Sequence, residues 1–146
     1  MDEEVQIQGY EYFDEDNESL RDPNTYLNKT PLEMVQQFAR CNDQILNHSW
    51  VKDSHKELFR ISLVQEEYGE LLSSTTAKNQ LKELADLIIV TYGYGATFGW
   101  NVDEAVRRVH ASNMSKNGPD GKPIKDENGK VLKGPNYKAP DLSDLV

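Results

Sequence analysis

The chain has little cysteine, no long apolar run and no concentration of basic residues, and each of these absences excludes a class of protein. Cys41 is the only cysteine, which excludes an intrachain disulfide and fits a reducing compartment. No apolar run is long enough to span a membrane, and no basic and then apolar signal segment follows Met1. The sequence therefore predicts a soluble, cytoplasmic protein without a membrane partner.

Basic residues are outnumbered, with 16 Lys and Arg against 25 Asp and Glu, and the net charge is −9. No basic patch marks a nucleic-acid-binding surface, so no nucleic-acid partner is expected. Residues 1–23 contain nine acidic residues and one basic residue, Arg21. We interpret residues 1–29 as a solvated acidic N-terminal arm. Tyr10, Tyr12 and Phe13 leave open the alternative that this arm is a flap over a site.

The apolar fraction is only 37% of 146 residues, which predicts one domain with a narrow core. A small core leaves apolar faces open, and pairing of subunits buries such faces. We therefore expect a homodimer or a homotetramer.

Three helix starts are recognisable from their capping residues. Thr30-Pro31-Leu32-Glu33 combines a capping threonine, a proline at the first helical position and a glutamate three residues after the cap. Ser54 and Glu57 repeat this pattern, and Asn101 and Glu104 are a variant of it. The spacing of apolar residues predicts four helices, and their expected ranges are Pro31–Leu46, His55–Leu72, Ala77–Phe98 and Val102–Lys116.

The composition changes after Asn117, where glycine and proline become frequent and the helical periodicity ends. Asp126-Glu127-Asn128-Gly129 lies between two short apolar-containing runs and predicts a small β-hairpin, followed by an extended tail. Short connections between the helices favour antiparallel neighbours. The expected fold is all-α: a four-helix bundle over residues 30–117, with a hairpin and tail over residues 118–146.

Five carboxylates are expected to converge on two neighbouring helices. Glu66, Glu67 and Glu70 fall on one side of the second helix, and Glu83 and Asp86 share a face of the third. Asp86 is followed by Leu-Ile-Ile-Val in the most apolar segment of the chain, where an uncompensated charge is costly. If the two helices are antiparallel, Glu70 and Glu83 lie at similar heights.

Such a cluster repels itself unless cations fill it. Mg²⁺ prefers oxygen ligands and is commonly shared between protein carboxylates and substrate phosphates. No histidine lies among the five acids, which argues against zinc. The alternative interpretation is a solvated acidic face, with Asp86 bonded to a neighbouring helix.

Arg60 lies about two helical turns before Glu67, on the same side of its helix. It could reach a phosphate group, but an ion pair with Glu57 or Glu67 is the expected role.

The acidic motif resembles the signature of the all-α nucleotide pyrophosphohydrolases, which include MazG, the dimeric dUTPases and phosphoribosyl-ATP pyrophosphohydrolase. The motif consists of Glu66-Glu67-Tyr68-Gly69-Glu70, twelve intervening residues and Glu83-Leu84-Ala85-Asp86. The resemblance continues through Ser112-Asn113-Met114-Ser115-Lys116, Asp120-Gly121-Lys122-Pro123 and Lys133-Gly134-Pro135-Asn136-Tyr137. The sequence looks like the MazG-like, phosphoribosyl-ATP-pyrophosphohydrolase-like proteins found in bacteria and phages.

The resemblance implies that Glu67, Glu70, Glu83 and Asp86 bind Mg²⁺ or Mn²⁺, with Glu66, Glu67 and Glu70 as the catalytic group. Glu66 then orients or deprotonates the attacking water. The implied reaction is hydrolysis between the α- and β-phosphates of a nucleotide.

The same resemblance assigns substrate contacts outside the acidic motif. It implies that Asn113 and Lys116 contact phosphate or sugar and that Lys133 and Tyr137 close over the phosphates or ribose. A cap at the end of a helix is the alternative role of Lys116. Gln36 is among the residues of the first helix expected to contact the base.

Three functions remain open from the sequence. The first is hydrolysis of a nucleoside triphosphate, (d)NTP, to the monophosphate and pyrophosphate, with dGTP or GTP as possible preferred substrates and control of nucleotide pools as the purpose. The second is hydrolysis of phosphoribosyl-ATP. The third is a non-catalytic helical interaction module that binds a basic partner through the acidic arm.

Overall fold

The computed structural model describes residues 28–146, so the interpretation of residues 1–27 as an arm or a flap lies outside the described part of the chain. The element order is α1 (Pro31–Cys41), α2 (His55–Ser73), α3 (Ala77–Thr97), α4 (Val102–Met114) and a short 3-10 helix, η3 (Ser143–Leu145). Residues 28–146 contain no β-strand, which confirms the all-α class. None of these helices is long and apolar enough to cross a membrane.

The capping residues place the starts of α1, α2 and α4 where the sequence predicts them. Thr30 and Glu33 form a complete capping box, in which the Glu33 carboxylate accepts the Thr30 N–H at 2.7 Å. The same position before α2 is filled by Ser54, and before α4 by Asn101. Thr76 caps α3 by accepting the Asn79 N–H at 3.2 Å. These side chains satisfy backbone donors that a helix start otherwise leaves without partners.

The first helix ends at Cys41, and its predicted extension to Leu46 is wrong. Asp43 has a positive φ of 53°, a left-handed conformation that cannot continue an α-helix. The Asn42 side chain donates to the Phe38 carbonyl at 2.8 Å, and the Gln44 N–H donates to the Ala39 carbonyl at 2.9 Å. Local bonds therefore satisfy the last carbonyls of α1 and turn the chain into the connection to α2.

The end of α3 agrees with the sequence-based expectation that Gly99 stops this helix. Gly99 has φ 72°, a conformation that glycine adopts without the cost that a Cβ imposes. The Trp100 N–H then donates to the Gly95 carbonyl at 3.0 Å. The chain turns at this point and starts α4.

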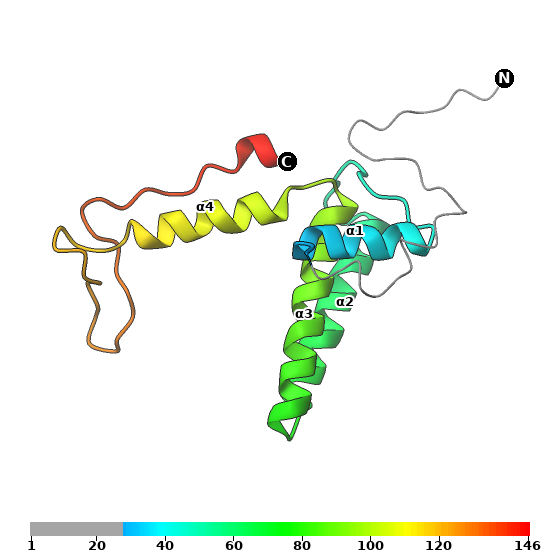
Figure 1. The fold of residues 1–146 in the computed structure, drawn as a ribbon, viewed down its shortest axis with the longest axis horizontal. Helices are drawn as coiled ribbons and strands as arrows, with labels where there is room; N and C mark the ends of the chain where they lie inside the picture. Colours follow the sequence, from blue (N-terminus) through cyan, green and yellow to red (C-terminus); the bar gives the residue numbers. More distant parts are fainter. Residues whose placement is uncertain (1–27) are drawn as a thin grey trace.

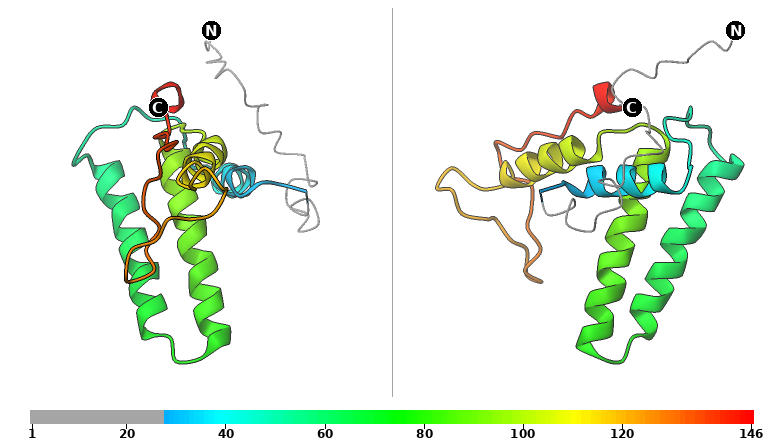
Figure 2. Two further views of the ribbon diagram at one scale, coloured as in Figure 1. Left: turned by 90° about the vertical axis from the view of Figure 1, so that its left-hand side faces the viewer. Right: turned by 45° about the vertical axis from the view of Figure 1, so that its right-hand side comes forward.

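The four helices form an open arrangement within one chain rather than a closed bundle. Figure 1 shows α2 and α3 as a long antiparallel hairpin, with α1 crossing α3 near its C-terminal end. In the same view α4 leaves the end of α3 at a steep angle and extends away from the hairpin. The views in Figure 2 show that the segment after α4 folds back along that helix.

The core is small and lies where α1 crosses α3. Leu32 and Val35 on α1 pack against Ala96 on α3, with Leu46 and Tyr92 at the border of this cluster. Many large apolar side chains on α2, α3 and α4 remain exposed. One chain therefore buries only part of the apolar surface that its helices offer.

A second group of contacts fixes the chain between α1 and α2 onto the end of α3. The buried Glu57 carboxylate accepts the Tyr94 hydroxyl at 3.2 Å, and Tyr94 in turn accepts the Trp50 ring N–H at 3.2 Å. Phe98 and Trp100 stack at tilted angles around Tyr94, at centroid distances of 5.4 and 5.8 Å. This network holds the open end of the α2–α3 hairpin together.

The hairpin predicted after Asn117 is limited to a single antiparallel bridge between Lys125 and Val131. The tail then runs back along α4. The Ser112 hydroxyl donates to the Lys138 carbonyl at 2.7 Å, and Arg108 forms an ion pair with Asp144, with Nη2 and Oδ2 3.0 Å apart. These contacts attach the tail to α4.

Two helical glycines test how closely α3 and α4 approach each other. A Cβ at Gly95 would overlap the Val102 side chain at the start of α4, whereas a Cβ at Gly69 on α2 meets nothing within 4 Å. We expect Gly95→Ala to lower the free energy of unfolding by roughly 1–3 kcal/mol through overpacking. Gly69→Ala, the matched control, should raise it by about 0.5–1 kcal/mol because alanine favours the helix. Urea unfolding followed by circular dichroism measures the free energy of unfolding of both variants. Equal changes in the two variants would contradict the close approach of α3 and α4 at Gly95.

Candidate metal centre

The antiparallel pairing of α2 and α3 brings acidic residues of both helices to the same height. The connection between the two helices is the short segment 74–76, so residues near the closed end of the hairpin are neighbours. Carboxylate oxygens of Glu67 and Glu70 on α2 and of Glu83 on α3 all lie within 4.8 Å of one another. We call these three residues the carboxylate cluster. The convergence that the sequence predicts is thus present for three of the five acids.

Glu67 is the member of the cluster with the least favourable surroundings. Its Oε2 atom is buried and has no hydrogen-bond partner among residues 28–146. Burial raises the pKa of the Glu67 carboxyl, and the negative charges of Asp86, Glu70 and Glu83 raise it further, with partial relief from Lys82. A buried acceptor without a donor costs free energy, and a cation at this position would remove that cost.

Asp86 lies next to the carboxylate cluster but is engaged by a lysine. Lys82 Nζ lies 2.9 Å from Asp86 Oδ2 and 3.0 Å from Glu83 Oε2, on the same turn of α3. These hydrogen bonds, first to Asp86 and then to Glu83, raise the pKa of the Lys82 ammonium group. Lys82 is not among the site residues predicted from the sequence, although its i,i+4 spacing to Asp86 is the usual signal for such a pair.

Glu66 is exposed and lies outside the carboxylate cluster. Residues i and i+1 of a helix point about 100° apart and residues i and i+4 about 40° apart, so Glu66 points away from Glu67 but lies on the same side of α2 as Glu70. A carboxylate in this position can contact a water molecule beside the cluster without being a ligand in it.

The residues predicted to contact phosphate and sugar form a second group. Lys116 Nζ donates to the Asn113 Oδ1 atom at 2.7 Å, and the Lys133 ammonium lies 4.6 Å from the centre of the Tyr137 ring. The Gly134 N–H donates to the Lys116 carbonyl at 3.0 Å and joins the two pairs. We call Asn113, Lys116, Lys133 and Tyr137 the polar group.

Within one chain, the polar group lies apart from the carboxylate cluster. Figure 1 shows that the C-terminal end of α4 and the segments after it lie far from the α2–α3 hairpin. Gln36 is half-buried on α1, which packs on the opposite end of α3 from Glu83. One chain by itself therefore does not bring all the predicted site residues together.

The expected ion pair of Arg60 with Glu57 or Glu67 is wrong. Glu57 lies 3.5 Å from Lys52 and accepts the Asp53 N–H and the Tyr94 hydroxyl instead. The Arg60 guanidinium reaches a neutral acceptor, Gln44 Oε1, at 3.3 Å.

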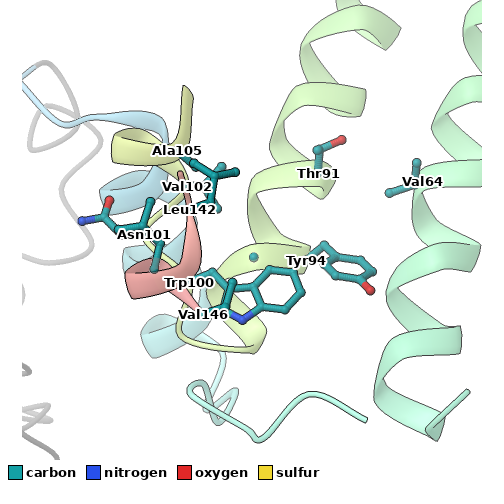
Figure 3. A pocket seen from close by; sticks show the side chains of 11 residues that line it. Val64, Thr91, Tyr94, Trp100, Asn101, Val102, Ala105, Leu142 and Val146 are labelled. Atoms are coloured by element: carbon teal, nitrogen blue, oxygen red, sulfur yellow. The ribbon is translucent and has the colours of Figure 1, made fainter. Parts of the chain in front are cut away.

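An apolar pocket lies on the hairpin near α4. Figure 3 shows Val64 on α2 and Thr91 and Tyr94 on α3 facing Val102 on α4, with Val146 of the tail beside them. Its lining contains no charged side chain. The pocket therefore differs in chemistry from the carboxylate cluster, because no carboxylate side chain lines it.

The donor set of the cluster fits a hard divalent cation. All its potential ligand atoms are carboxylate oxygens, the preferred ligands of Mg²⁺ and Mn²⁺. The Glu67 oxygen without a partner supplies an unused acceptor in the same place. Glu67, Glu70 and Glu83 are the residues that could hold such an ion, with Asp86 as the nearest further carboxylate.

Comparison with known proteins gives one family. The family described as phosphoribosyl-ATP pyrophosphohydrolase matches residues 35–113, which is more than half of the chain. The matched range runs from α1 to the end of α4 and includes the carboxylate cluster. No curated protein matches the chain.

The raised pKa of Glu67 predicts a pH dependence of stability in the metal-free protein. The folded chain binds the Glu67 proton more tightly than the unfolded chain, so stability falls as the pH rises from the ordinary value of 4.5 through the raised pKa. Glu67→Gln should remove this loss and raise the melting temperature at neutral pH by at least about 2 °C.

Mn²⁺ at 100 times its dissociation constant should stabilise the unaltered chain by about 2.7 kcal/mol and the Glu67→Gln variant much less. Differential scanning calorimetry with and without Mn²⁺ measures both effects. Glu127→Gln, at an exposed position outside the cluster, is the control and should leave both unchanged. Equal stabilisation of Glu67→Gln and the unaltered chain would contradict the role of Glu67.

Proposed function

The chain belongs to the phosphoribosyl-ATP pyrophosphohydrolase family of nucleotide pyrophosphohydrolases, and on this premise we propose that it is a metal-dependent nucleoside triphosphate pyrophosphohydrolase. The reaction converts (d)NTP and water to (d)NMP and pyrophosphate in the cytoplasm. The observation that supports it most is the carboxylate cluster, with its partnerless Glu67 oxygen.

In the proposed site, Glu67, Glu70, Glu83 and Asp86 hold Mg²⁺ or Mn²⁺. The ion would neutralise phosphate oxygens and lower the pKa of a bound water. Lys82 bonds to both Asp86 and Glu83, so these two carboxylates would release Lys82 in order to serve as metal ligands. The lysine thereby limits the repulsion among the acids while the cluster lacks a cation.

Glu66 orients the attacking water and takes its proton. Its exposure beside the cluster supports this role, because the group that handles the proton must touch water and remain outside the metal ligands. The water then attacks the α-phosphorus, and the bond between the α-phosphorus and the bridging oxygen breaks. Pyrophosphate leaves with that oxygen, and the nucleoside monophosphate remains.

The substrate is proposed to be a canonical or modified nucleoside triphosphate, with dGTP or GTP as the first candidates and control of nucleotide pools as the purpose. Phosphoribosyl-ATP is the second candidate because the matching family carries that description. Both substrates present the same α–β phosphoanhydride to the carboxylate cluster. They differ in the group on the base, which lies away from the reacting bond.

A panel of nucleotides tests the reaction and separates the candidates. Each ribo- and deoxyribonucleoside triphosphate and phosphoribosyl-ATP is incubated with the protein and Mg²⁺ or Mn²⁺, and the products are resolved by ion-exchange chromatography. We expect monophosphate and pyrophosphate from one or a few triphosphates. Asp86→Asn should lower kcat by at least ~10³-fold with unchanged helical content, since metal stabilisation of transition-state charge amounts to several kcal/mol.

Glu127→Gln is again the matched control and should retain full activity. If Asp86→Asn kept its activity, Asp86 would not be a ligand. If the protein turned over none of the nucleotides and Mn²⁺ did not stabilise it, the non-catalytic helical module would be the better interpretation.

We also propose that a second copy of the chain completes the site. Tyr68 and Leu72 on α2, and Leu81, Leu84 and Ile88 on α3, form an exposed apolar face. The row on α2 continues at i,i+4 spacing to Val64, and the row on α3 continues at i,i+3 spacing to Thr91. Val64 and Thr91 both line the pocket of Figure 3, so the two rows lie on the same side of the hairpin. Burial of this face against a second copy offsets the small core of one chain.

The separation of the polar group from the carboxylate cluster supports the same proposal. Asn113, Lys116, Lys133 and Tyr137 lie at the far end of α4, which extends away from its own hairpin (Figure 1). In a homodimer or a homotetramer, α4 of one chain can place its polar group beside the carboxylates of another.

Complementation between two inactive variants tests this arrangement. Asp86→Asn removes a proposed metal ligand and Lys116→Ala removes a phosphate contact. We expect each variant alone to be nearly inactive and a mixture, unfolded and refolded together, to recover activity, because some pairs contain one site with both residues intact.

Light scattering after size exclusion should show a dimer or tetramer. Ile88→Glu should dissociate it, and Ile89→Glu, at a similarly exposed position about 100° around the helix, should not. A mixture as inactive as its components would place both residues in the same chain's site.

A further inference from the structure

The Arg60 guanidinium lies between α2 and α3 and has no carboxylate partner among residues 28–146. Its side chain is partly buried, and one guanidinium nitrogen bonds to Gln44 Oε1 at 3.3 Å. The guanidinium also lies 5.8 Å from the centre of the Phe59 ring. Burial lowers the pKa of the guanidinium, although the group stays charged.

Two arginines of α4 have carboxylate partners and so differ from Arg60. Arg107 lies 2.9 Å from a Glu104 oxygen, and Arg108 is bound by both Glu104 and Asp144. Removing a charge from water is costly unless an opposite charge or several hydrogen bonds compensate it. Arg60 bears this cost with only a neutral amide and an aromatic ring as partners, so its position favours an anion that arrives from outside the chain.

The neighbouring helix leaves room for the guanidinium at one position. A Cβ added to Gly93 on α3 would lie 3.3 Å from Arg60 Nη1, closer than most side-chain contacts. Alanine would require the guanidinium to shift by a few tenths of an ångström, and a larger, β-branched residue would displace it from α3. Gly93 thus allows Arg60 to lie between the helices.

The register of the hairpin aligns Arg60 with the carboxylate cluster. Arg60 and Glu67 are seven residues apart on α2, and Gly93 and Asp86 are seven apart on α3, so each pair shares a face. The helices are antiparallel, and Arg60 opposite Gly93 therefore lies about 10 Å along the hairpin from Glu67 opposite Asp86. A phosphate chain and a long arginine side chain can together cover this separation.

We propose that Arg60 is a positioning residue that binds a phosphate group of the substrate remote from the α-phosphorus. This inference rests on the proposed function and identifies how the same site holds the part of the substrate that leaves as pyrophosphate. Arg60 offers two parallel N–H donors, the geometry that suits phosphate oxygens. Its partnerless charge draws the phosphate chain along the hairpin, which orients the bond to be cleaved over the carboxylate cluster.

Arg60 also contacts the connection between α1 and α2 through Gln44, and that contact supplies the alternative role. If Arg60 only held this connection in place, removal of the Gln44 side chain would lower pyrophosphate affinity as much as removal of the Arg60 guanidinium. Gln44 is exposed and lies outside the proposed machinery, so Gln44→Ala separates the two roles.

The experiment uses the full-length chain and inorganic pyrophosphate, the leaving part of the substrate, as the probe. Isothermal titration calorimetry with Mn²⁺ present measures pyrophosphate binding without turnover. Arg60→Gln should weaken binding about 10–150-fold, the range for a lost hydrogen bond to a charged group. Arg60→Lys should recover part of the affinity, and Gln44→Ala and Arg107→Gln should retain all of it.

Steady-state kinetics with the best triphosphate provide the second readout. Arg60→Gln should raise KM more than it lowers kcat, since the contact is remote from the reacting atoms. Mn²⁺ stabilisation should be the same in this variant, because the metal ligands are untouched. If Arg60→Gln did not fold, Gly93→Val would take its place, because it keeps the arginine while its larger side chain displaces the guanidinium; it too should weaken pyrophosphate binding.

The outcomes separate this inference from the proposed function. Turnover with unchanged KM and pyrophosphate affinity in Arg60→Gln would overturn the inference and leave the function standing. Pyrophosphate binding that depends on Arg60, without turnover of any triphosphate, would support the inference and overturn the proposed substrate class. Equal losses in Gln44→Ala and Arg60→Gln, or no pyrophosphate binding by the unaltered chain with Mn²⁺, would overturn the inference.

Discussion

Repulsion among the acids between α2 and α3 is the interaction on which the rest of this structure depends. Glu67, Glu70 and Glu83 place oxygens within 4.8 Å of one another, and one buried oxygen of Glu67 has no partner. Burial and these like charges raise the pKa of Glu67, and their repulsion destabilises the fold unless a cation is present. Lys82 provides part of that positive charge from within the chain, on the side of Asp86.

The hairpin can tolerate this repulsion because it is fastened at both ends. The connection of residues 74–76 and the Thr76 cap fix the closed end. At the open end, the buried Glu57 and the rings around Tyr94 bind the chain before α2 to α3. The apolar core lies at this open end, far from the acids. Stability is thus concentrated at one end of the molecule and the charged chemistry at the other.

The open arrangement has a functional meaning in the proposed enzyme. A closed bundle within one chain would bury the apolar face of the hairpin and hold α4 against it. In the structure α4 extends outward and carries the polar group away, while the apolar face remains exposed. In the proposed oligomer, the association of two chains would both complete the site and bury the apolar face. The proposed phosphate contact of Arg60 would come from the same chain as the carboxylate cluster.

The sequence by itself determined the all-α class, the starts of α1, α2 and α4, the end of α3 at Gly99 and the convergence of Glu67, Glu70 and Glu83. These features follow from local rules, because capping side chains act within one helical turn and helix periodicity sets which residues share a face. Tertiary structure decided the rest. The early end of α1 and the Lys82–Asp86 pair rest on local bonds, but the Arg60 guanidinium beside Gly93 and the distance of α4 from the hairpin depend on which atoms meet across elements. Several acceptors compete for each such side chain, and only the packed chain selects among them.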